Sequence, residues 1–464
     1  MLRVDELLKA TAGCLVSGKK DSLIKGISID SRDIKKGEAF IAIKGNNFDG
    51  HNFIDAAIKK GASCIIQRAK GPKRPLPCRQ AGSAPGTVYI EVRDTVRALG
   101  DIARYQRCKF NIPVIAITGT NGKTTTKDMV AWVLSKSFKV LKNEGTKNNQ
   151  IGLSLALLNL DPSHEVAVLE LGTNHFGEID YLTKICLPNI GVITNIGPAH
   201  LEHFHSLKGV LREKYNLIEN LKGPQLTIFN SDDNLLRTRL SRAGRRPFVL
   251  SFGIERKSDF IASQIRFSAE RIRFLARGKY KFTLKTLGYH NIYNALAAIA
   301  IARVFGIEYG TLARQLAVFE FPCGRLKLKR LNRMSFIDDT YNSNPSSLEQ
   351  ALNALTNLRI KGRRIFVMGD MLELGSRRKT FHHRIGQRVG RVCDVFITVG
   401  RLSELAASAA KSFGFDAKNI FTCASVEQAR DILVHKISAC RDDLILVKGS
   451  RAMKMEEIFK PLSP

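Results

Sequence analysis

"VIAITGTNGKTTTKDMVAWVL", residues 114–134, joins a β-branched run, a glycine-containing turn and an amphipathic segment. The β-branched run at 114–118 predicts a strand, and the apolar spacing between 129 and 134 predicts a helix. In a strand–loop–helix unit, the backbone N–H groups of the loop and of the helix N-terminus form a site for polyphosphate. The stretch therefore predicts an α/β sheet that binds a nucleotide.

Within this loop, Lys123 would reach the β and γ phosphates of ATP, and the Thr124 hydroxyl would coordinate Mg²⁺. The usual G-x-x-x-x-G-K-[ST] pattern is incomplete because position 117 is Ile. The prediction depends on the flanking strand and helix, since the G-K-T tripeptide alone is common. The predicted ATP-binding loop comprises Gly119, Thr120, Asn121, Gly122, Lys123, Thr124 and Thr125.

Length and composition limit the class of protein. The 464 residues suggest about three domains of roughly 150 residues each. No stretch reaches the ~18 apolar residues of a membrane span, and the first residues predict an amphipathic helix and not a signal peptide, so we expect a cytoplasmic protein. Nine cysteines without a C-x-x-C pair indicate neither a disulfide scaffold nor a thiolate zinc site, and we expect them to be reduced and mostly buried.

The chain is strongly basic, with 73 Lys and Arg against 42 Asp and Glu and a net charge of +31. Such a charge is typical of nucleic-acid-binding proteins. The basic residues are spread along the chain, however, and the densest stretches, "RIRFLARGKYKFTLK" and "GRLKLKRLNR", alternate with apolar residues as half-solvated strands do. We therefore expect no nucleic-acid partner, and keep a P-loop regulatory ATPase that binds nucleic acid as an alternative.

Three blocks with different patterns predict an α/β protein of three domains. Residues 1–110 mix short strands and helices, with an exposed loop at 71–86. Residues 111–321 alternate strands and helices as a parallel sheet with helices on both faces does, and end in an Ala/Ile-rich helix. Residues 322–464 repeat the alternation and predict a Rossmann-like sheet.

Several polar residues follow predicted strands. Glu170 and His200 come just after strands, where open α/β sheets bind ligands, so both could hold Mg²⁺. His200, His203 and His205 lack the thiolate or H-E-x-x-H context of a zinc site. Alternatives stay open elsewhere: Lys214 could be a surface charge, and the asparagines of "YHNIYNAL" could either bind adenine or cap a helix.

Together these segments resemble the Mur ligases, ATP-dependent amide-forming enzymes of peptidoglycan precursor synthesis. The resemblance spans nearly the whole chain and rests on "SIDSRDIKKGEAFIAIKGNNFDGHNF", "GTNGKTTTKDMV", "TKNNQIGLSLALL", "ELGTNHFGEID", "NIGPAHLEHF", "HNIYNALAA", "DDTYNSNPSSLEQAL", "VMGDMLELG" and "VKGSRAMKME". Within the family, "YNSNP" and "GDMLELG" favour the branch that adds a dipeptide. The D-N-P-R signature of the branch that adds a single diaminopimelate or lysine is not found.

The resemblance implies roles for individual residues. Four of them would hold two Mg²⁺ ions: Thr124, Glu170, His200 and Lys214, the last as a CO₂-derived carbamate. Asn291 and Asn294 would lie beside adenine, and Arg325 and Asp339 would contact γ-phosphate and ribose. The catalytic set is then Lys123, Glu170, His200, Lys214 and Arg325. The first domain would bind the uridine nucleotide through Ser31, Arg32, Asp49, Gly50 and His51. Two asparagines, Asn148 and Asn149, would face the muramoyl peptide, and the incoming dipeptide would meet Tyr341, Asn342, Asn344 and Ser346.

The reaction that the resemblance implies joins D-alanyl-D-alanine to UDP-N-acetylmuramoyl-tripeptide through an acyl phosphate, with the protein acting as a monomer. A sibling that adds one amino acid, a folate polyglutamylating enzyme and a degenerate scaffold without catalysis are the alternatives. The uridine-binding segments of the first block argue against folate, and the intact set of Lys123, Glu170, His200 and Lys214 argues against a scaffold. The sequence identifies no general base.

Overall fold

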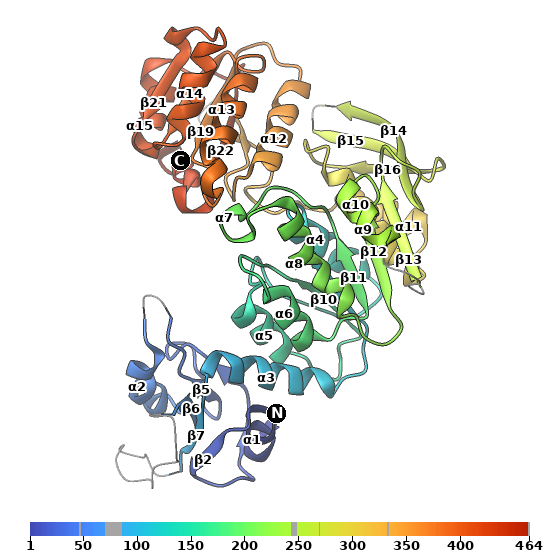
Figure 1. Ribbon diagram of the computed structural model, residues 1–464, viewed down its shortest axis with the longest axis vertical. Helices are drawn as coiled ribbons and strands as arrows, with labels where there is room; N and C mark the ends of the chain where they lie inside the picture. Colours follow the sequence, from blue (N-terminus) through green and yellow to red (C-terminus); the bar gives the residue numbers. More distant parts are fainter. Residues whose placement is uncertain (46–47, 70–85, 243–247, 269, 332–333, 463–464) are drawn as a thin grey trace.

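The computed structural model describes all residues except 46–47, 70–85, 243–247, 269, 332–333 and 463–464. Three sheets lie one after another along the long axis, in chain order from the N-terminal to the C-terminal end (Figure 1). The predicted α/β fold class is confirmed. The domain boundaries near 110 and 321 stay predictions, and the expected loop at 71–86 lies almost entirely outside the described residues.

The first sheet has five strands in the order β2-β7-β6-β5-β4, and all neighbours except β2 and β7 are parallel. Its strands are β2 (Cys14–Ser17), β4 (Ile27–Ser28), β5 (Ala39–Ile41), β6 (Cys64–Arg68) and β7 (Val88–Val92). A small pair, β1 (Leu2–Arg3) and β3 (Leu23–Ile24), stands beside it. The accompanying helices are α1 (Val4–Thr11), α2 (Ile54–Lys59) and α3 (Thr95–Cys108).

The second sheet has nine strands, in the order β16-β15-β14-β13-β12-β11-β8-β10-β9. Seven of them form a parallel series: β9 (Val140–Lys142), β10 (Val166–Glu170), β8 (Val114–Thr118), β11 (Ile190–Ile193), β12 (Leu226–Asn230), β13 (Phe248–Gly253) and β14 (Phe260–Ser268). The basic stretch 271–285 forms the antiparallel hairpin β15 (Arg271–Ala276) and β16 (Tyr280–Leu284). The sheet is thus mixed at one edge, where a wholly parallel sheet was predicted.

Helices cover both faces of this sheet because strand residues point alternately to either side. Ile115 and Ile117 pack with α4 (Lys123–Leu134) and α10 (Asn291–Val304), while Ala116 and Leu169 pack on the opposite face with α5 (Gln150–Leu158), α6 (Glu178–Cys186) and α8 (Leu207–Glu219). Shorter helices complete this region, namely α7 (Leu201–Phe204), α9 (Asn234–Ser241) and α11 (Tyr309–Ala317).

The third sheet is ordered β17-β18-β22-β19-β20-β21, and only the hairpin β17–β18 is antiparallel. Its strands are β17 (Lys327–Leu331), β18 (Met334–Asp338), β19 (Arg364–Gly369), β20 (Val395–Val399), β21 (Ile420–Cys423) and β22 (Leu444–Lys448). On one face lie α12 (Pro345–Asn357), α13 (Arg378–Val389) and α14 (Ser403–Ser412), and α15 (Val426–Asp431) lies on the other.

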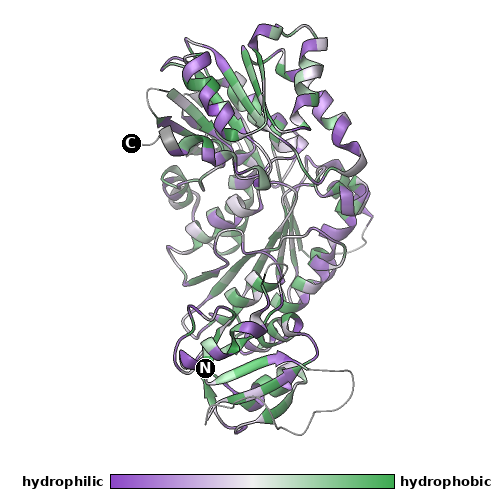
Figure 2. Ribbon diagram, turned by 90° about the vertical axis from the view of Figure 1, so that its left-hand side faces the viewer, coloured by the Kyte–Doolittle hydropathy of each residue, from purple (hydrophilic) through white to green (hydrophobic). Residues whose placement is uncertain are grey.

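The hydrophobic residues gather in the strands and in the helix faces that pack on them, and polar residues lie outward (Figure 2). α10 is apolar nearly all round and correspondingly buried, as its Ala/Ile-rich sequence predicts. Of the eight described cysteines, four are exposed, so the expectation of mostly buried thiols is only half right. None of the helices in the described ranges is long and apolar enough to cross a membrane.

Candidate active site

The phosphate loop closes tightly after β8. Gly119 and Gly122 have φ angles of +150° and +83°, a region that side chains disfavour. A Cβ on Gly119 would lie 1.9 Å from Oγ1 of Thr194, and one on Gly122 would lie 2.3 Å from Oδ1 of Asn294. The Lys123 ammonium donates to the carbonyls of Gly119 and Thr120 at 2.9 and 3.2 Å, so it folds back over the loop.

The loop is held by the segment after β11. Asn195 accepts through its side chain from the N–H of Asn121 at 2.9 Å, and its carbonyl accepts from the N–H of Thr120 at 2.9 Å. Thr194 donates through its hydroxyl to the carbonyl of Asn121 at 2.6 Å. Asn195 is not among the residues predicted from the sequence. Its position just after a buried strand is the same signal that identified Glu170.

Glu170 ends β10 beside the phosphate loop, because it pairs in register with Ile117 of β8. The side chain is 1 % exposed. Its Oε1 accepts from the Asn148 amide at 2.6 Å, whereas Oε2 has no hydrogen-bond partner among the described residues. An unpaired buried carboxylate oxygen is costly unless a ligand completes it, and oxygen is the donor that Mg²⁺ prefers. Glu170, with the buried Thr124 nearby in the loop, therefore fits a magnesium site.

Lys214 is a buried amine on α8, 2 % exposed. Burial, together with the positive charge of Lys123, holds the pKa of Lys214 well below its ordinary value, against the opposing effect of Glu213 and Glu170. Burial likewise lowers the pKa of Lys123, opposed by Glu170 and aided by Arg325. The charges of these residues act on one another, so four of them form one electrostatic cluster: Lys123, Glu170, Lys214 and Arg325.

The third domain supplies further cations. The Arg325 guanidinium lies 4.0 Å from the centroid of the Tyr341 ring. Lys448, buried at the end of β22, donates to Asp339 at 2.5 Å and to the carbonyl of Asn342 at 2.9 Å. Burial and the charges of Lys448 and Arg325 lower the pKa of His290 to about 4. Lys448 belongs to the motif "VKGSRAMKME" but is not among the predicted site residues. Its signal was a lysine that ends a strand.

A cavity of about 230 Å³ opens at the boundary between the second and third sheets. Asn344 bridges this boundary, because its amide donates to Oδ1 of Asn121 at 2.8 Å while its own Oδ1 caps α12 by accepting from the N–H of Ser347. The cavity lining includes Asn121, Gly122, Asn195, Asp232, His290, Tyr293, Asn294, Ser346 and Gln350. Asn344 and Ser346 thus lie beside the nucleotide loop, and their contact with a dipeptide stays a prediction.

The two asparagines of α10 underlie the phosphate loop. Asn294 donates to Asn291 at 2.9 Å and accepts from the Thr126 hydroxyl at 3.2 Å, and Asn291 donates to Thr286 at 2.7 Å. Both side chains are buried, but only Asn294 lines the cavity. These hydrogen bonds join α10 to the first turns of α4, and the adenine contact of both residues stays a prediction.

The first domain contains a separate cavity of about 700 Å³. Asp49 and His51 line it, with 2.6 Å between an Asp49 oxygen and Nδ1 of His51. Gly50 between them allows a tight approach, since a Cβ there would lie 2.7 Å from the backbone nitrogen of Ile43. Other lining residues are Lys44, Asn52, Gln67, Arg68, Tyr89, Asp94 and Thr95. Ser31 is buried and Arg32 is an exposed partner of Asp30, at 2.7 Å, and neither lines this cavity.

The remaining predicted residues are placed as follows. Asn149 caps α5 by accepting from the N–H of Gly152 at 2.9 Å. Asn342 accepts from the N–H of Arg451 at 3.2 Å. His200 stands before α7, and its Nδ1 lies 2.6 Å from Oε2 of Glu373 in the third domain. Thr125 is buried in the first turn of α4.

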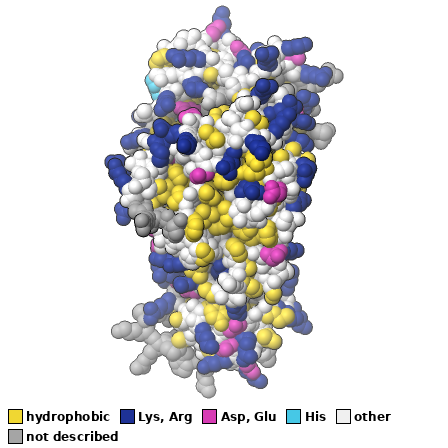
Figure 3. Space-filling view, turned by 90° about the vertical axis from the view of Figure 1, so that its right-hand side faces the viewer, with side chains coloured by type: hydrophobic (Ala, Val, Ile, Leu, Met, Phe, Trp, Pro, Cys, Tyr) yellow, Lys and Arg dark blue, Asp and Glu magenta, His cyan; other side chains and the backbone are white. Residues whose placement is uncertain are grey.

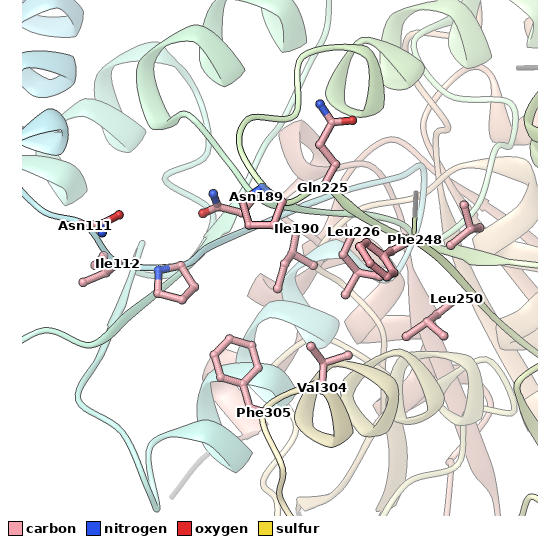
Figure 4. Close-up of a pocket in the computed structure, with 13 residues that line it drawn as sticks. Asn111, Ile112, Asn189, Ile190, Gln225, Leu226, Phe248, Leu250, Val304 and Phe305 are labelled. Carbon is pink, nitrogen blue, oxygen red and sulfur yellow. The ribbon is translucent and has the colours of Figure 1, made fainter. Parts of the chain in front are cut away.

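A larger, apolar cavity of about 760 Å³ lies at the amino ends of the central strands, away from the phosphate loop. Ile190, Leu226 and Phe248, which begin neighbouring strands, line it together with Val304 and Phe305 from the end of α10 (Figure 4). Apolar side chains form a continuous area on the face seen in Figure 3, with Lys and Arg distributed around it. Ligands of open α/β sheets bind at the carboxyl ends of the strands, and this cavity is at the amino ends. We therefore place the chemistry at the phosphate loop.

Three family models match consecutive parts of the chain. Residues 23–107 match the Mur ligase family catalytic domain, residues 117–302 the Mur ligase middle domain, and residues 324–451 the Mur ligase glutamate ligase domain. The chain is 35 % identical to the UDP-N-acetylmuramoyl-tripeptide--D-alanyl-D-alanine ligase of Bacillus subtilis, over 96 % of this chain and 94 % of the relative.

Solved structures agree with these matches. MurF from Acinetobacter baumannii has a TM-score of 0.87 at 31 % identity, over 99 % of this chain and 98 % of that one. The MurF ligase from Thermotoga maritima in complex with ADP has a TM-score of 0.81 at 28 % identity, over 95 % of this chain and 98 % of that one.

Proposed function

The chain belongs to the Mur ligase family, and we propose that it is the ATP-dependent ligase that joins D-alanyl-D-alanine to UDP-N-acetylmuramoyl-tripeptide in peptidoglycan precursor synthesis. The family membership predicted from the sequence motifs is confirmed. The observation that carries the substrate assignment is the match to D-alanyl-D-alanine ligases along almost the whole of both chains. That match covers 96 % of this chain and so extends into the first and third domains.

In this proposal, ATP binds between the second and third domains, with its polyphosphate along the loop. Lys123 contacts the β and γ phosphates, and Arg325 approaches from the third domain. Two cations at one boundary favour a polyanion, because an excess of like charge is otherwise unfavourable. Bound Mg²⁺ would offset the charge shared by polyphosphate and carboxylate; Thr124, Glu170, His200 and Lys214 would hold it.

The terminal carboxylate of the tripeptide attacks the γ phosphorus, and the bond between that phosphorus and the ADP oxygen breaks. The resulting acyl phosphate has a good leaving group, which the free carboxylate lacks. The amine of D-alanyl-D-alanine then attacks the acyl carbon, phosphate leaves, and an amide forms. The phosphate loop and Lys123 hold the γ phosphate in place for the first step. The amine's proton passes to solvent, since the described site presents no assigned base.

Lys214 fits the predicted carbamate because its amine is buried and its pKa is lowered. Only a neutral amine adds CO₂, and desolvation favours the neutral form. The carbamate would turn this neutral amine into an anionic, carboxylate-like ligand near Glu170. The buried position would thereby gain the negative charge and the oxygen atoms that Mg²⁺ prefers.

The substrates bind at separate places. The uridine nucleotide would occupy the cavity around Asp49 and His51, while Asn148, fixed by its contact with Glu170, would face the muramoyl peptide. The incoming dipeptide would approach from the third domain near Tyr341 and Asn342. We further propose that the enzyme works in the cytoplasm as a monomer and has no nucleic-acid partner.

The test is release of phosphate from ATP in the presence of UDP-N-acetylmuramoyl-tripeptide, with D-alanyl-D-alanine, diaminopimelate or lysine added separately. Mass spectrometry follows the product in parallel. We expect phosphate release and a pentapeptide product with D-alanyl-D-alanine alone. Turnover with diaminopimelate or lysine would assign the chain to a sibling activity. Absence of turnover with all three amines would refute the proposal.

A further inference from the structure

Two residues from different domains meet at the edge of the nucleotide site. Nδ1 of His200, in the second domain, lies 2.6 Å from Oε2 of Glu373, in the loop after β19 of the third domain. The backbones also approach here, since the N–H of Glu202 donates to the carbonyl of Glu373 at 3.4 Å. Glu202 and Glu373 both line a cleft of about 740 Å³, which lies beside this contact.

Both residues have an unfavourable backbone conformation. His200 has a φ angle of +51° and Glu373 one of +62°, the left-handed region that favours glycine. Strain of this kind persists where the surroundings enforce it, and it concentrates at functional sites. The neighbours of Glu373 provide that support, because Met371 and Leu374 are buried in the core of the third domain.

Strength of the ion pair does not explain this arrangement. The Glu373 side chain is 52 % exposed and that of His200 is 21 % exposed. An ion pair this accessible contributes little to stability. Two further histidines lie nearby: the His175 and His203 rings are 4.1 Å apart between centroids and tilted by 43°, and Nδ1 of His175 lies 3.6 Å from Oε1 of Glu178.

A histidine that binds a metal through one ring nitrogen usually donates the other N–H to a carboxylate, which fixes the ring and its tautomer. We propose that Glu373 is a positioning residue that holds His200 in this way, with Nδ1–H directed to Glu373 and Nε2 left for Mg²⁺. This inference rests on the proposed role of His200 as a magnesium ligand. Its consequence is that the third domain completes the metal site of the second, so metal affinity depends on domain docking.

The experiment measures binding of Mn²⁺, as a probe for Mg²⁺, by electron paramagnetic resonance in the presence of a non-hydrolysable ATP analogue. Loss of an outer partner of this kind typically weakens metal binding by about 10- to 100-fold, and we expect Glu373→Gln to do so. Glu202→Gln is the matched control, because this carboxylate lines the same cleft and the His200 contact is made by Glu373. It should leave the Mn²⁺ affinity unchanged.

His200→Ala separates the inference from the proposed function. If His200→Ala weakens Mn²⁺ binding and Glu373→Gln does not, the inference is wrong and the magnesium role of His200 stands. If His200→Ala itself has no effect, the proposed metal site is wrong. Affinity for ADP without metal is the second readout: a simple latch between domains would weaken it in Glu373→Gln, whereas a positioning role leaves it unchanged.

Discussion

Replacing Asp339 by Asn should destabilise the third domain strongly, because it leaves the ammonium of Lys448 without its counter-charge. Both side chains are buried and their charged atoms lie 2.5 Å apart. Removing one partner of such a pair costs about 3–5 kcal/mol, since the remaining charge is desolvated and uncompensated. Asp339 also accepts from the N–H of Leu326 at 3.2 Å, a hydrogen bond that the oxygen of Asn can keep. The predicted loss therefore comes mainly from the charge.

Hydrogen exchange of the β18 and β22 amides, followed by mass spectrometry, measures this loss locally. A destabilisation of 3–5 kcal/mol corresponds to exchange about 10²- to 4 × 10³-fold faster, at 1.4 kcal/mol per factor of ten. The double variant Asp339→Asn with Lys448→Met removes both charges, so it should recover most of the protection lost by Asp339→Asn alone. Additive losses in the double variant would show that the two charges do not compensate each other and would refute the reasoning.

Three further predictions concern the site and its surroundings. Lys214→Ala should abolish ligase activity, and short carboxylic acids should restore part of it by replacing the carbamate; no rescue would count against carbamylation. Since the pKa of His290 falls from 6.5 to about 4 on folding, the unfolded state binds more protons in this range, so stability should drop by up to about 3 kcal/mol as pH falls from 6.5 to 4. His290→Gln should remove that part of the pH dependence of urea unfolding. X-ray scattering should report compaction when an ATP analogue and the muramoyl substrate bind together, because cations from two domains meet at the polyphosphate; unchanged profiles would contradict domain closure.

The sequence predicts local elements well because their signals are local. The β-branched run and glycine turn at 114–122 specify a strand and a loop, and Glu170 is identified by its place after an apolar strand. The alternation in 271–285 predicts half-solvated strands, which the structure confirms as β15 and β16. The alternation alone does not predict that these two strands extend the central sheet in an antiparallel arrangement. That arrangement depends on β14, which pairs in parallel with β13 and antiparallel with β15, and its own residue pattern is compatible with both kinds of pairing.

Side-chain contacts between residues far apart in the sequence are the part that sequence reasoning cannot supply. Asn121 meets Asn344 across 223 positions, and Lys448 reaches Asp339 across 109. Neither sequence separation corresponds to the period of a helix or a strand, so no pattern within one element predicts the partner residue. Lys448 is an ordinary strand-end lysine until β22 is placed beside β18. The family motifs predict roles for single residues, whereas the contacts between those residues follow only from the order of the strands in the sheets.

The division of the site between two domains has a consequence for the mechanism. The phosphate loop, Glu170 and Lys214 all belong to the second domain and are held by contacts within it, whereas Arg325, Lys448 and Glu373 arrive with the third. A nucleotide could therefore bind the loop with the domains apart, but the full set of cations would surround its polyphosphate only when they dock. The polyphosphate would neutralise these cations and so stabilise the docked domains, because the cations repel one another when no polyanion lies between them. ATP binding and domain docking should accordingly strengthen each other by the same free energy.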